Sequence, residues 1–210
     1  MNIEARQLGK RFSQRWIILG FSHTFPPGSR TAVQGANGSG KSTLLAMLAG
    51  RLEPSRGAVL VDDDRGPELP DNYYRRVSFQ GPYLELPGEL NCTELFAAHA
   101  RIRGFQPGTS AEEGIELLQL PRAVLRERIL GFSSGMIQRV RLVLALLSRS
   151  DLVLLDEPTS NLDRAGVRWF EQLVAENLGP RTLIVASNEE RDFLHCAPQR
   201  IDAQAWLPGR

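Results

Sequence analysis

The segment Gly35-Ala36-Asn37-Gly38-Ser39-Gly40-Lys41-Ser42 decides the fold, because it matches the pattern G-x-x-x-x-G-K-[ST] of a phosphate-binding loop. Residues 31–34 before it predict a buried strand, and residues 41–48 after it predict a helix. The glycines let the backbone turn its N–H groups toward phosphate oxygens, and the helix adds its positive N-terminal end. Lys41 is expected to reach the β- and γ-phosphates of a nucleotide, and the Ser42 hydroxyl is expected to bind Mg²⁺.

A second apolar run, at residues 152–155, ends in two carboxylates, Asp156 and Glu157. An aspartate at the carboxyl end of a buried strand beside a phosphate loop can hold the water shell of Mg²⁺. The glutamate after it can accept a proton from an attacking water, or orient that water. Alone, this run is also typical of any strand that ends in solvent; beside a phosphate loop, it indicates a nucleotide site.

Composition narrows the class of protein. The chain has 210 residues and a net charge of +1, from 25 Lys and Arg against 24 Asp and Glu, which excludes a strongly basic nucleic-acid footprint. Hydrophobic residues make up 42% of the chain, enough for a sizeable core. Cys92 and Cys196 form no CxxC pair, so a reducing compartment is expected. The apolar runs are far below the ~20 residues of a membrane span, and no secretory signal follows Met1, so we expect a cytosolic protein.

Hydrophobic patterning predicts an α/β core with a helical insertion. Residues 3–25 alternate in a way that predicts short half-buried strands, and residues 59–61, 77–79 and 183–186 predict further strands. Residues 62–67 predict a solvated turn rather than a metal site. The chain turns helical from 91 to about 149: Asn91 and Glu94 form a capping pair, residues 115–120 mark a second helix, and residues 136–147 predict a buried one.

A further segment narrows the class of nucleotide-binding protein. Residues 132–139 read Phe-Ser-Ser-Gly-Met-Ile-Gln-Arg, similar to the signature L-S-G-G-Q-x-Q-R of ATP-binding cassette (ABC) transporter ATPases. Gln80 at the end of a strand, Glu157 after Asp156, and residues 160–163 (Ser-Asn-Leu-Asp, the family's D-loop) follow the phosphate loop in the family's order. Over nearly its whole length, the sequence resembles the ATPase subunit of an ABC transporter.

The signature segment has a physical logic of its own. Ser133 can cap the helix that begins there, which leaves backbone N–H groups pointing outward, and Gly135 allows close approach of a ligand. The resemblance implies that this surface closes over ATP bound to a second subunit; the alternative is an ordinary capped core helix. It also implies that Phe12 stacks on adenine. The resemblance implies three sets of site residues. Those at the nucleotide are Phe12, Gly35, Ala36, Asn37, Gly38, Ser39, Gly40, Lys41, Ser42, Thr43, Ser133, Gly135 and Asp163. Those at Mg²⁺ are Ser42, Gln80 and Asp156, and those in catalysis are Lys41, Gln80, Glu157 and Asn188.

The sequence departs from the family pattern at three positions. Ser134 and Met136 replace a glycine and a glutamine of the signature, and both changes are tolerable. Asn188 stands where the family has a histidine at the γ-phosphate, and an amide cannot become cationic, so slow hydrolysis is expected. His195, predicted in a helical stretch at 189–196, is not a substitute. His23, His99 and His195 are interpreted as surface or packing residues.

Two further segments leave alternatives open. Tyr83 and Leu84 either dock a membrane partner, as the resemblance implies for this stretch, or pack internally. Five arginines between residues 122 and 141 favour a solvated helical face over a nucleic-acid surface. They are Arg122, Arg126, Arg128, Arg139 and Arg141.

The resemblance implies an α/β fold: a P-loop NTPase core sheet with an N-terminal antiparallel β subdomain and an inserted helical subdomain. We expect one ABC ATPase domain over 1–210, with about 1–86 and 146–210 as core and about 87–145 as the helical part. The expected function is ATP binding and hydrolysis, with Mg²⁺, by a head-to-tail dimer of cassettes that powers a transmembrane partner. We expect the chain to lie in the cytoplasm, peripheral to the membrane through this partner, and we expect no nucleic-acid partner. The short chain resembles minimal subunits of export systems, including haem exporters. The alternatives are a soluble non-transport ABC ATPase and a slow or degenerate cassette acting as an ATP-dependent clamp.

Overall fold

A five-stranded parallel sheet holds the strand of the phosphate loop between two neighbours. The computed structural model describes residues 1–62, 73–190 and 195–206. The strand order is β5-β6-β7-β3-β8. The bounds are β3 Arg30–Gln34, β5 Val77–Gln80, β6 Leu152–Asp156, β7 Thr182–Ser187 and β8 Gln199–Asp202. Every residue of β6 and β7 is buried, as continuous apolar runs inside a parallel sheet require.

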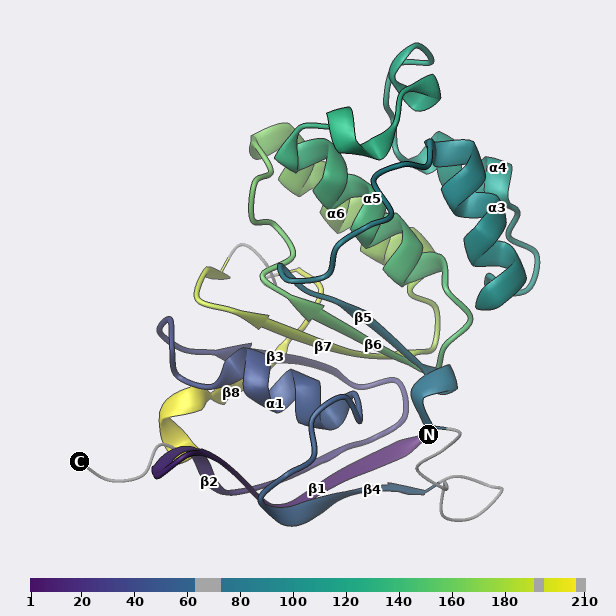
Figure 1. Cartoon of the computed structure of the whole chain (residues 1–210). Coiled ribbons are helices and arrows are strands. Elements are labelled where there is room, and N and C mark those ends of the chain that lie inside the picture. The colour runs from purple at the N-terminus through teal and green to yellow at the C-terminus, as the bar shows by residue number, and fades with distance from the viewer. Residues whose placement is uncertain (63–72, 191–194, 207–210) are drawn as a thin grey trace.

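Helices cover both faces of this sheet (Figure 1). Helices α5 (Ser134–Leu147) and α6 (Arg164–Asn177) lie on one face, and α1 (Lys41–Leu48) lies on the other. Successive side chains of a strand point to opposite faces. Val153 and Leu155 therefore join the core under α5 and α6, and Leu152 and Leu154 join the core that contains α1. The mixed α/β fold expected from the sequence is confirmed.

An antiparallel sheet packs beyond α1, in the order β2-β1-β4 (Figure 1). The strands are β1 Asn2–Phe12, β2 Arg15–Phe25 and β4 Arg56–Asp62. The prediction of short strands at the N-terminus was wrong, because β1 and β2 have 11 residues each. The register shifts between Ala5 and Leu8, and Gln7 has a φ of +49°. Such a bulge interrupts the two-residue alternation, so one long strand looks like several short ones in the sequence.

The segment between β5 and β6 is helical, as predicted. It contains α3 (Cys92–Ile102), α4 (Ala111–Leu117), the 3₁₀ turns Val124–Arg126 and Ile129–Gly131, and α5. Asn91 and Glu94 form the predicted capping box of α3, and Ser110 and Glu113 form a second one at α4. The second predicted helix ends at Leu117, before Leu120.

The remaining described elements are the 3₁₀ turns η1 (Tyr74–Arg76) and η5 (Ala203–Trp206). The predicted turn at 62–67 falls largely outside the described residues, and the predicted helix at 189–196 includes positions 191–194, which are also outside them. Within the described part of the chain, every helix is too short or too polar to cross a membrane.

Candidate functional site

The phosphate loop follows β3 and leads into α1. Gly40, with a φ of +92°, is the residue that precedes α1. Because glycine has no side chain, no side-chain hydrogen bond from this position caps the first turn of the helix. The first N–H groups of α1 are thus left to a ligand. Lys41 is only 5% exposed, and its Nζ donates to the carbonyl oxygens of Gly35 at 2.9 Å and Ala36 at 3.2 Å. The ammonium group is therefore held within the loop.

Close packing explains two glycines of this loop. A Cβ on Gly35 would lie 2.6 Å from the Cβ of Ala203, and a Cβ on Gly40 would lie 3.0 Å from Cγ2 of Ile17. The indole N–H of Trp206 donates to the carbonyl of Ser39 at 3.2 Å. Sequence reasoning missed Trp206, because it lies 167 positions from Ser39 along the chain and belongs to no local motif.

The acidic pair ends β6 beside the loop. Glu157 has a φ of +48°, a left-handed conformation that is strained for a residue with a side chain. Its carboxylate lies 3.6 Å from Nζ of Lys41. The predicted base and the predicted phosphate-binding cation thus share one site.

The Asp156 carboxyl fits a role at a divalent cation. It is 2% exposed, and its Oδ1 has no hydrogen-bond partner among the described residues. Burial raises the pKa of this carboxyl, while a hydrogen bond from Ser42 acts in the opposite direction. A buried carboxylate with one free oxygen beside a hydroxyl is the oxygen-ligand chemistry that Mg²⁺ prefers. Ser42 and Asp156 therefore fit the metal role expected of them.

The end of β7 lies between the acidic pair and the phosphate loop, because β7 pairs with both β6 and β3. Ser187, its last residue, donates from Oγ to Oε2 of Glu157 at 2.9 Å. Asn188 follows and is exposed. The sequence analysis did not assign a role to Ser187; its position one residue before Asn188 was the only signal available.

These segments enclose a cavity of about 770 Å³, here called the phosphate-loop cavity. Nine predicted site residues line it: Phe12, Asn37, Gly38, Gly40, Lys41, Ser42, Thr43, Glu157 and Asn188. Phe12 is 49% exposed, with Nζ of Lys10 lying 5.4 Å from the centroid of its ring. An exposed aromatic ring at this cavity can stack on a base. Ile17, Pro82, Tyr83, Ser160 and Glu189 also line it. Tyr83 is thus placed at this cavity and Leu84 at another, which separates two residues that the sequence analysis treated together.

Eight predicted site residues do not line the phosphate-loop cavity. Gly35, Ala36 and Ser39 belong to the phosphate loop and Asp156 precedes Glu157, whereas the other four come from elsewhere in the fold. Ser133 caps α5 by accepting from the N–H of Met136, as predicted, and Gly135 is in the first turn of that helix. Asp163 caps α6 by accepting from the N–H of Gly166 at 2.7 Å. Gln80 ends β5, is 2% exposed, and lines a second cavity.

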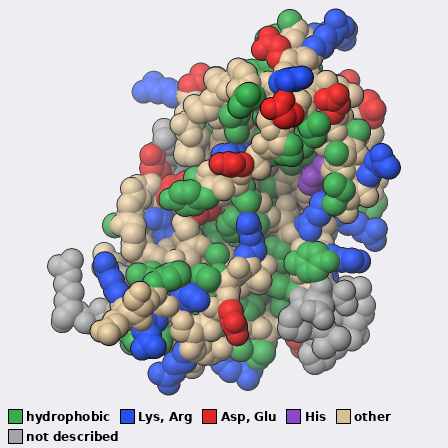
Figure 2. Space-filling view, viewed as in Figure 1, with side chains coloured by type: hydrophobic (Ala, Val, Ile, Leu, Met, Phe, Trp, Pro, Cys, Tyr) green, Lys and Arg blue, Asp and Glu red, His purple; other side chains and the backbone are tan. Residues whose placement is uncertain are grey.

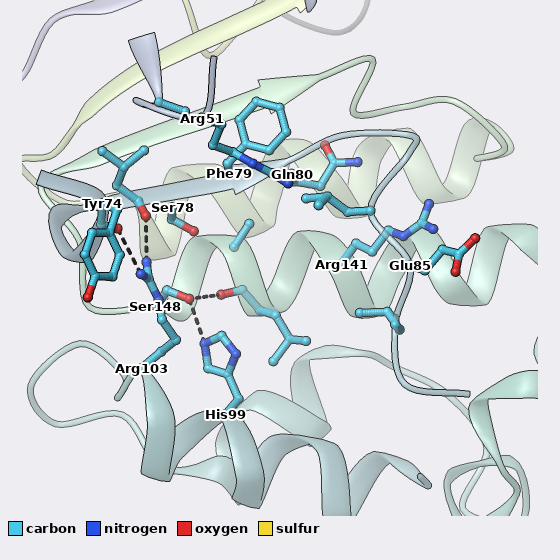
Figure 3. A pocket seen from close by; sticks show the side chains of 16 residues that line it. Arg51, Tyr74, Ser78, Phe79, Gln80, Glu85, His99, Arg103, Arg141 and Ser148 are labelled. Atoms are coloured by element: carbon cyan, nitrogen blue, oxygen red, sulfur yellow. Dashed lines mark hydrogen bonds between the residues drawn. The ribbon is translucent and has the colours of Figure 1, made fainter. Parts of the chain in front are cut away.

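This second cavity, of about 450 Å³, lies between β5 and the helical segment (Figure 3). Arg103, the residue that follows α3, lines this cavity and donates to the carbonyl oxygens of Tyr74 and Val77, as the dashed lines in Figure 3 show. Figure 2 shows the outer surface from the same side as Figure 1. Hydrophobic side chains are exposed across the middle of this face, with basic side chains between them.

The histidine interpretations are confirmed. His99 packs on the ring of Phe105 and lies 2.7 Å from Oγ of Ser148; burial, aided by Arg103, lowers its pKa to about 4. His23 packs against the ring of Phe25. His195 is exposed at the surface.

The prediction of one solvated arginine face was wrong for two of the five residues. Arg139 lies over the ring of Trp169 at 4.5 Å and donates to the carbonyl of Leu118, and Arg141 is half-buried. These two residues lie on α5, which packs against the sheet, so their side chains cover the core. The other three are exposed: Arg122, Arg126 and Arg128.

A parallel sheet with a phosphate loop after one strand, and with carboxylates at the end of the strand two positions away in the sheet, defines the class of P-loop ATPases. Comparison with known proteins places the chain within that class. Residues 18–160 match the family model described as "ABC transporter". The chain is 32% identical to the cytochrome c biogenesis ATP-binding export protein CcmA of Rhizobium meliloti, over 90% of this chain and 92% of that protein. It is also 32% identical to the daunorubicin/doxorubicin resistance ATP-binding protein DrrA of Streptomyces peucetius, over 95% of this chain and 61% of that protein.

A solved structure supports the same fold. A bacterial ABC transporter cassette, determined as a dimer, has a TM-score of 0.80 with this chain at 20% identity, covering 99% of this chain and 100% of that one. The chain belongs to the ABC transporter family, as an ATP-binding subunit with the ATPase fold of that family.

Proposed function

We propose that this chain hydrolyses ATP in a head-to-tail dimer of cassettes and thereby powers a transmembrane partner. One observation carries the dimer. Lys41, Glu157 and Asn188 line one cavity, whereas Ser133 and Gly135, at the N-terminal end of α5, lie outside it. The N-terminal end of α5 is a second surface that can bind an anion, and it lies away from the nucleotide of its own chain. It can bind phosphate if it closes over the nucleotide of another chain.

Within the site, each residue has a physical role. Lys41 and the first N–H groups of α1 bind the phosphates, and Phe12 stacks on the base. Ser42 and Asp156 hold Mg²⁺, which neutralises phosphate charge when bound. Glu157 accepts the proton of the attacking water, and Asn188 donates a hydrogen bond to the γ-phosphate. Gln80 and Asp163 lie outside the phosphate-loop cavity; Gln80 is proposed to contribute to the Mg²⁺ site and to catalysis, and Asp163 to nucleotide binding.

The second cavity is proposed as the docking site of the membrane partner. It contains Leu84 and Glu85, from the stretch that the family resemblance assigns to this contact, and Tyr74 is 53% exposed at its lining. A partner bound there would hold the chain at the cytoplasmic face of a membrane. The similarity to an export protein over 92% of its length supports an export-type subunit.

The dimer is tested with the variant Glu157→Gln. An amide cannot accept the proton, so this variant should bind ATP and fail to turn it over. Size-exclusion chromatography with ATP should then show a dimer. Adding Ser133→Arg should abolish it, whereas Ser110→Arg, which removes the equivalent cap of α4, should not.

Two outcomes would contradict the proposed dimer and its chemistry. Turnover of Glu157→Gln at the wild-type rate would show that Glu157 is not the base. A monomer of this variant with bound ATP would show that the nucleotide does not join two chains head to tail.

The docking site is tested separately, by co-purification with a membrane protein. The wild type should co-purify with it, and Leu84→Asp should lose the membrane protein while keeping ATPase activity. Equal recovery of the membrane protein with the variant would contradict the docking site.

A further inference from the structure

Gln138, in the second turn of α5, occupies a buried position between three parts of the site. Its side chain is 1% exposed, and its Nε2 donates to the carbonyl of Pro158 at 2.7 Å. Its Oε1 lies 3.4 Å from Nε2 of Gln80. We propose that Gln138 is a positioning residue for ATP hydrolysis: it fixes the backbone that carries Glu157 and joins that backbone to α5 and to the end of β5. The proposal rests on the role of Glu157 as the base.

The contact with Pro158 acts directly on the backbone of Glu157, which precedes it. Glu157 adopts its left-handed φ of +48° without being a glycine. A residue remains in such a conformation only when its surroundings hold it there. Three hydrogen bonds do so: from Gln138 to Pro158, from the N–H of Glu157 to Ala186 at 2.8 Å, and from the N–H of Ser160 to Glu157 at 3.2 Å. The bond from Gln138 is the shortest and the one that comes from a side chain.

The two buried amides are not equally well bound. Gln138 uses both ends of its amide, with a short bond on one side. Gln80 has only the 3.4 Å contact, at the long end of the hydrogen-bond range, and its Oε1 is unpartnered in the described structure. Gln80 can therefore change partners at little cost, while Gln138 stays fixed.

A second close approach ties α5 to the same segment. A Cβ on Gly135 would lie 2.9 Å from the carbonyl oxygen of Asn161. The first two turns of α5 thus meet residues 158–161 at two points, Gly135 and Gln138. The cap residue Ser133 and the base Glu157 are thereby held at a set distance from each other.

The test measures kcat and KM for ATP in Gln138→Met, which keeps the volume and loses both hydrogen bonds. Because a misplacement of about 1 Å in a catalytic group can cost a hundredfold, we expect kcat to fall about tenfold to a hundredfold, with KM within about twofold. The matched control is Gln106→Met. Gln106 donates from Nε2 to the carbonyl oxygens of Ser148 and Ser150, near the other end of α5 and away from the site.

A second variant, Gln138→Glu, gives a readout that a merely structural role would not move. A protonated carboxyl can donate to Pro158, an ionised one cannot, and burial raises the pKa of such a group. Turnover of Gln138→Glu should therefore be near the wild-type value at low pH and fall as pH rises, relative to the wild type at each pH. This measurement also stands if Gln138→Met does not fold.

Three results would overturn the proposal. They are an unchanged kcat in Gln138→Met, a loss no larger than that of Gln106→Met, and a pH profile of Gln138→Glu parallel to that of the wild type. Glu157→Gln is measured in the same assay. Turnover retained there contradicts the role of Glu157, whereas turnover lost there and kept in Gln138→Met contradicts only the role of Gln138.

Discussion

Replacing Asn188 by histidine is expected to raise the rate of ATP hydrolysis. Asn188 follows β7 and lines the phosphate-loop cavity with Lys41 and Glu157. Its amide can donate a hydrogen bond to a phosphate oxygen but carries no charge. An imidazolium there adds a second cation beside Lys41, where negative charge must be stabilised in the transition state.

The size of the effect follows from the position of Asn188. Two unit charges 4 Å apart near a protein surface interact by about 4 kcal/mol. Only the part that differs between the ground state and the transition state changes the rate. Asn188 is exposed in the single chain, so solvent screens the charge further. About 1.4–2.7 kcal/mol of differential stabilisation would raise turnover about tenfold to a hundredfold.

The assay is phosphate release at saturating ATP, with nucleotide affinity measured by calorimetry. Affinity should change much less than kcat. Turnover of Asn188→His should also decline as pH rises through the range in which histidine loses its proton. Asn188→Gln, which keeps an amide, is the control and should show neither effect. Equal or lower turnover in Asn188→His would refute the reasoning and mean that another residue of the cavity supplies the contact.

Three further outcomes are expected. Lys41→Ala should weaken ATP affinity at least about a hundredfold in a calorimetric titration, because the phosphates lose a charge-assisted donor that the loop holds in place; unchanged affinity would contradict the phosphate-loop assignment. Asp156→Asn should abolish most of the gain in ATP affinity that Mg²⁺ provides, and a gain equal to that of the wild type would exclude Asp156 from the metal site. The pKa of His99 is lowered from 6.5 to about 4, so the unfolded chain binds this proton first as pH falls, and the free energy of unfolding should drop by about 2–3 kcal/mol between pH 7 and 4.5. Denaturant titrations at pH 7 and 4.5 measure this drop, and a drop of the same size in His99→Gln would show that His99 is not its source.

Local sequence was sufficient for most elements of the core. Residues that are neighbours in the chain define these elements. They are the buried strand before the phosphate loop, α1 after it, and the apolar runs of β6 and β7. Their patterns are therefore complete within a short window of residues. The caps at Asn91 and Ser133 were predictable for the same reason, since a cap bonds to an N–H three residues ahead.

The bulge in β1 shows where hydrophobic patterns fail to predict a strand. A single left-handed residue, Gln7, shifts which side chains face the core, and its N–H donates to Oγ of Ser22 on β2, 15 positions away in the chain. The half-buried arginines of α5 show the same limit. Arg139 is covered by Trp169 of α6, which is distant from it in sequence.

By itself, the sequence determined the chemistry of this protein: a phosphate loop, a cation in it, and two carboxylates at the end of an apolar strand. Only the tertiary structure decided how these groups meet. The order β6-β7-β3 sets Ser187 against Glu157 and Asn188 beside the loop, and the packing of α5 puts Gln138 between Gln80 and Pro158. Motif residues follow local backbone preferences, whereas hydrogen bonds across strands and helices depend on sheet order and burial. Those are set by the whole core at once.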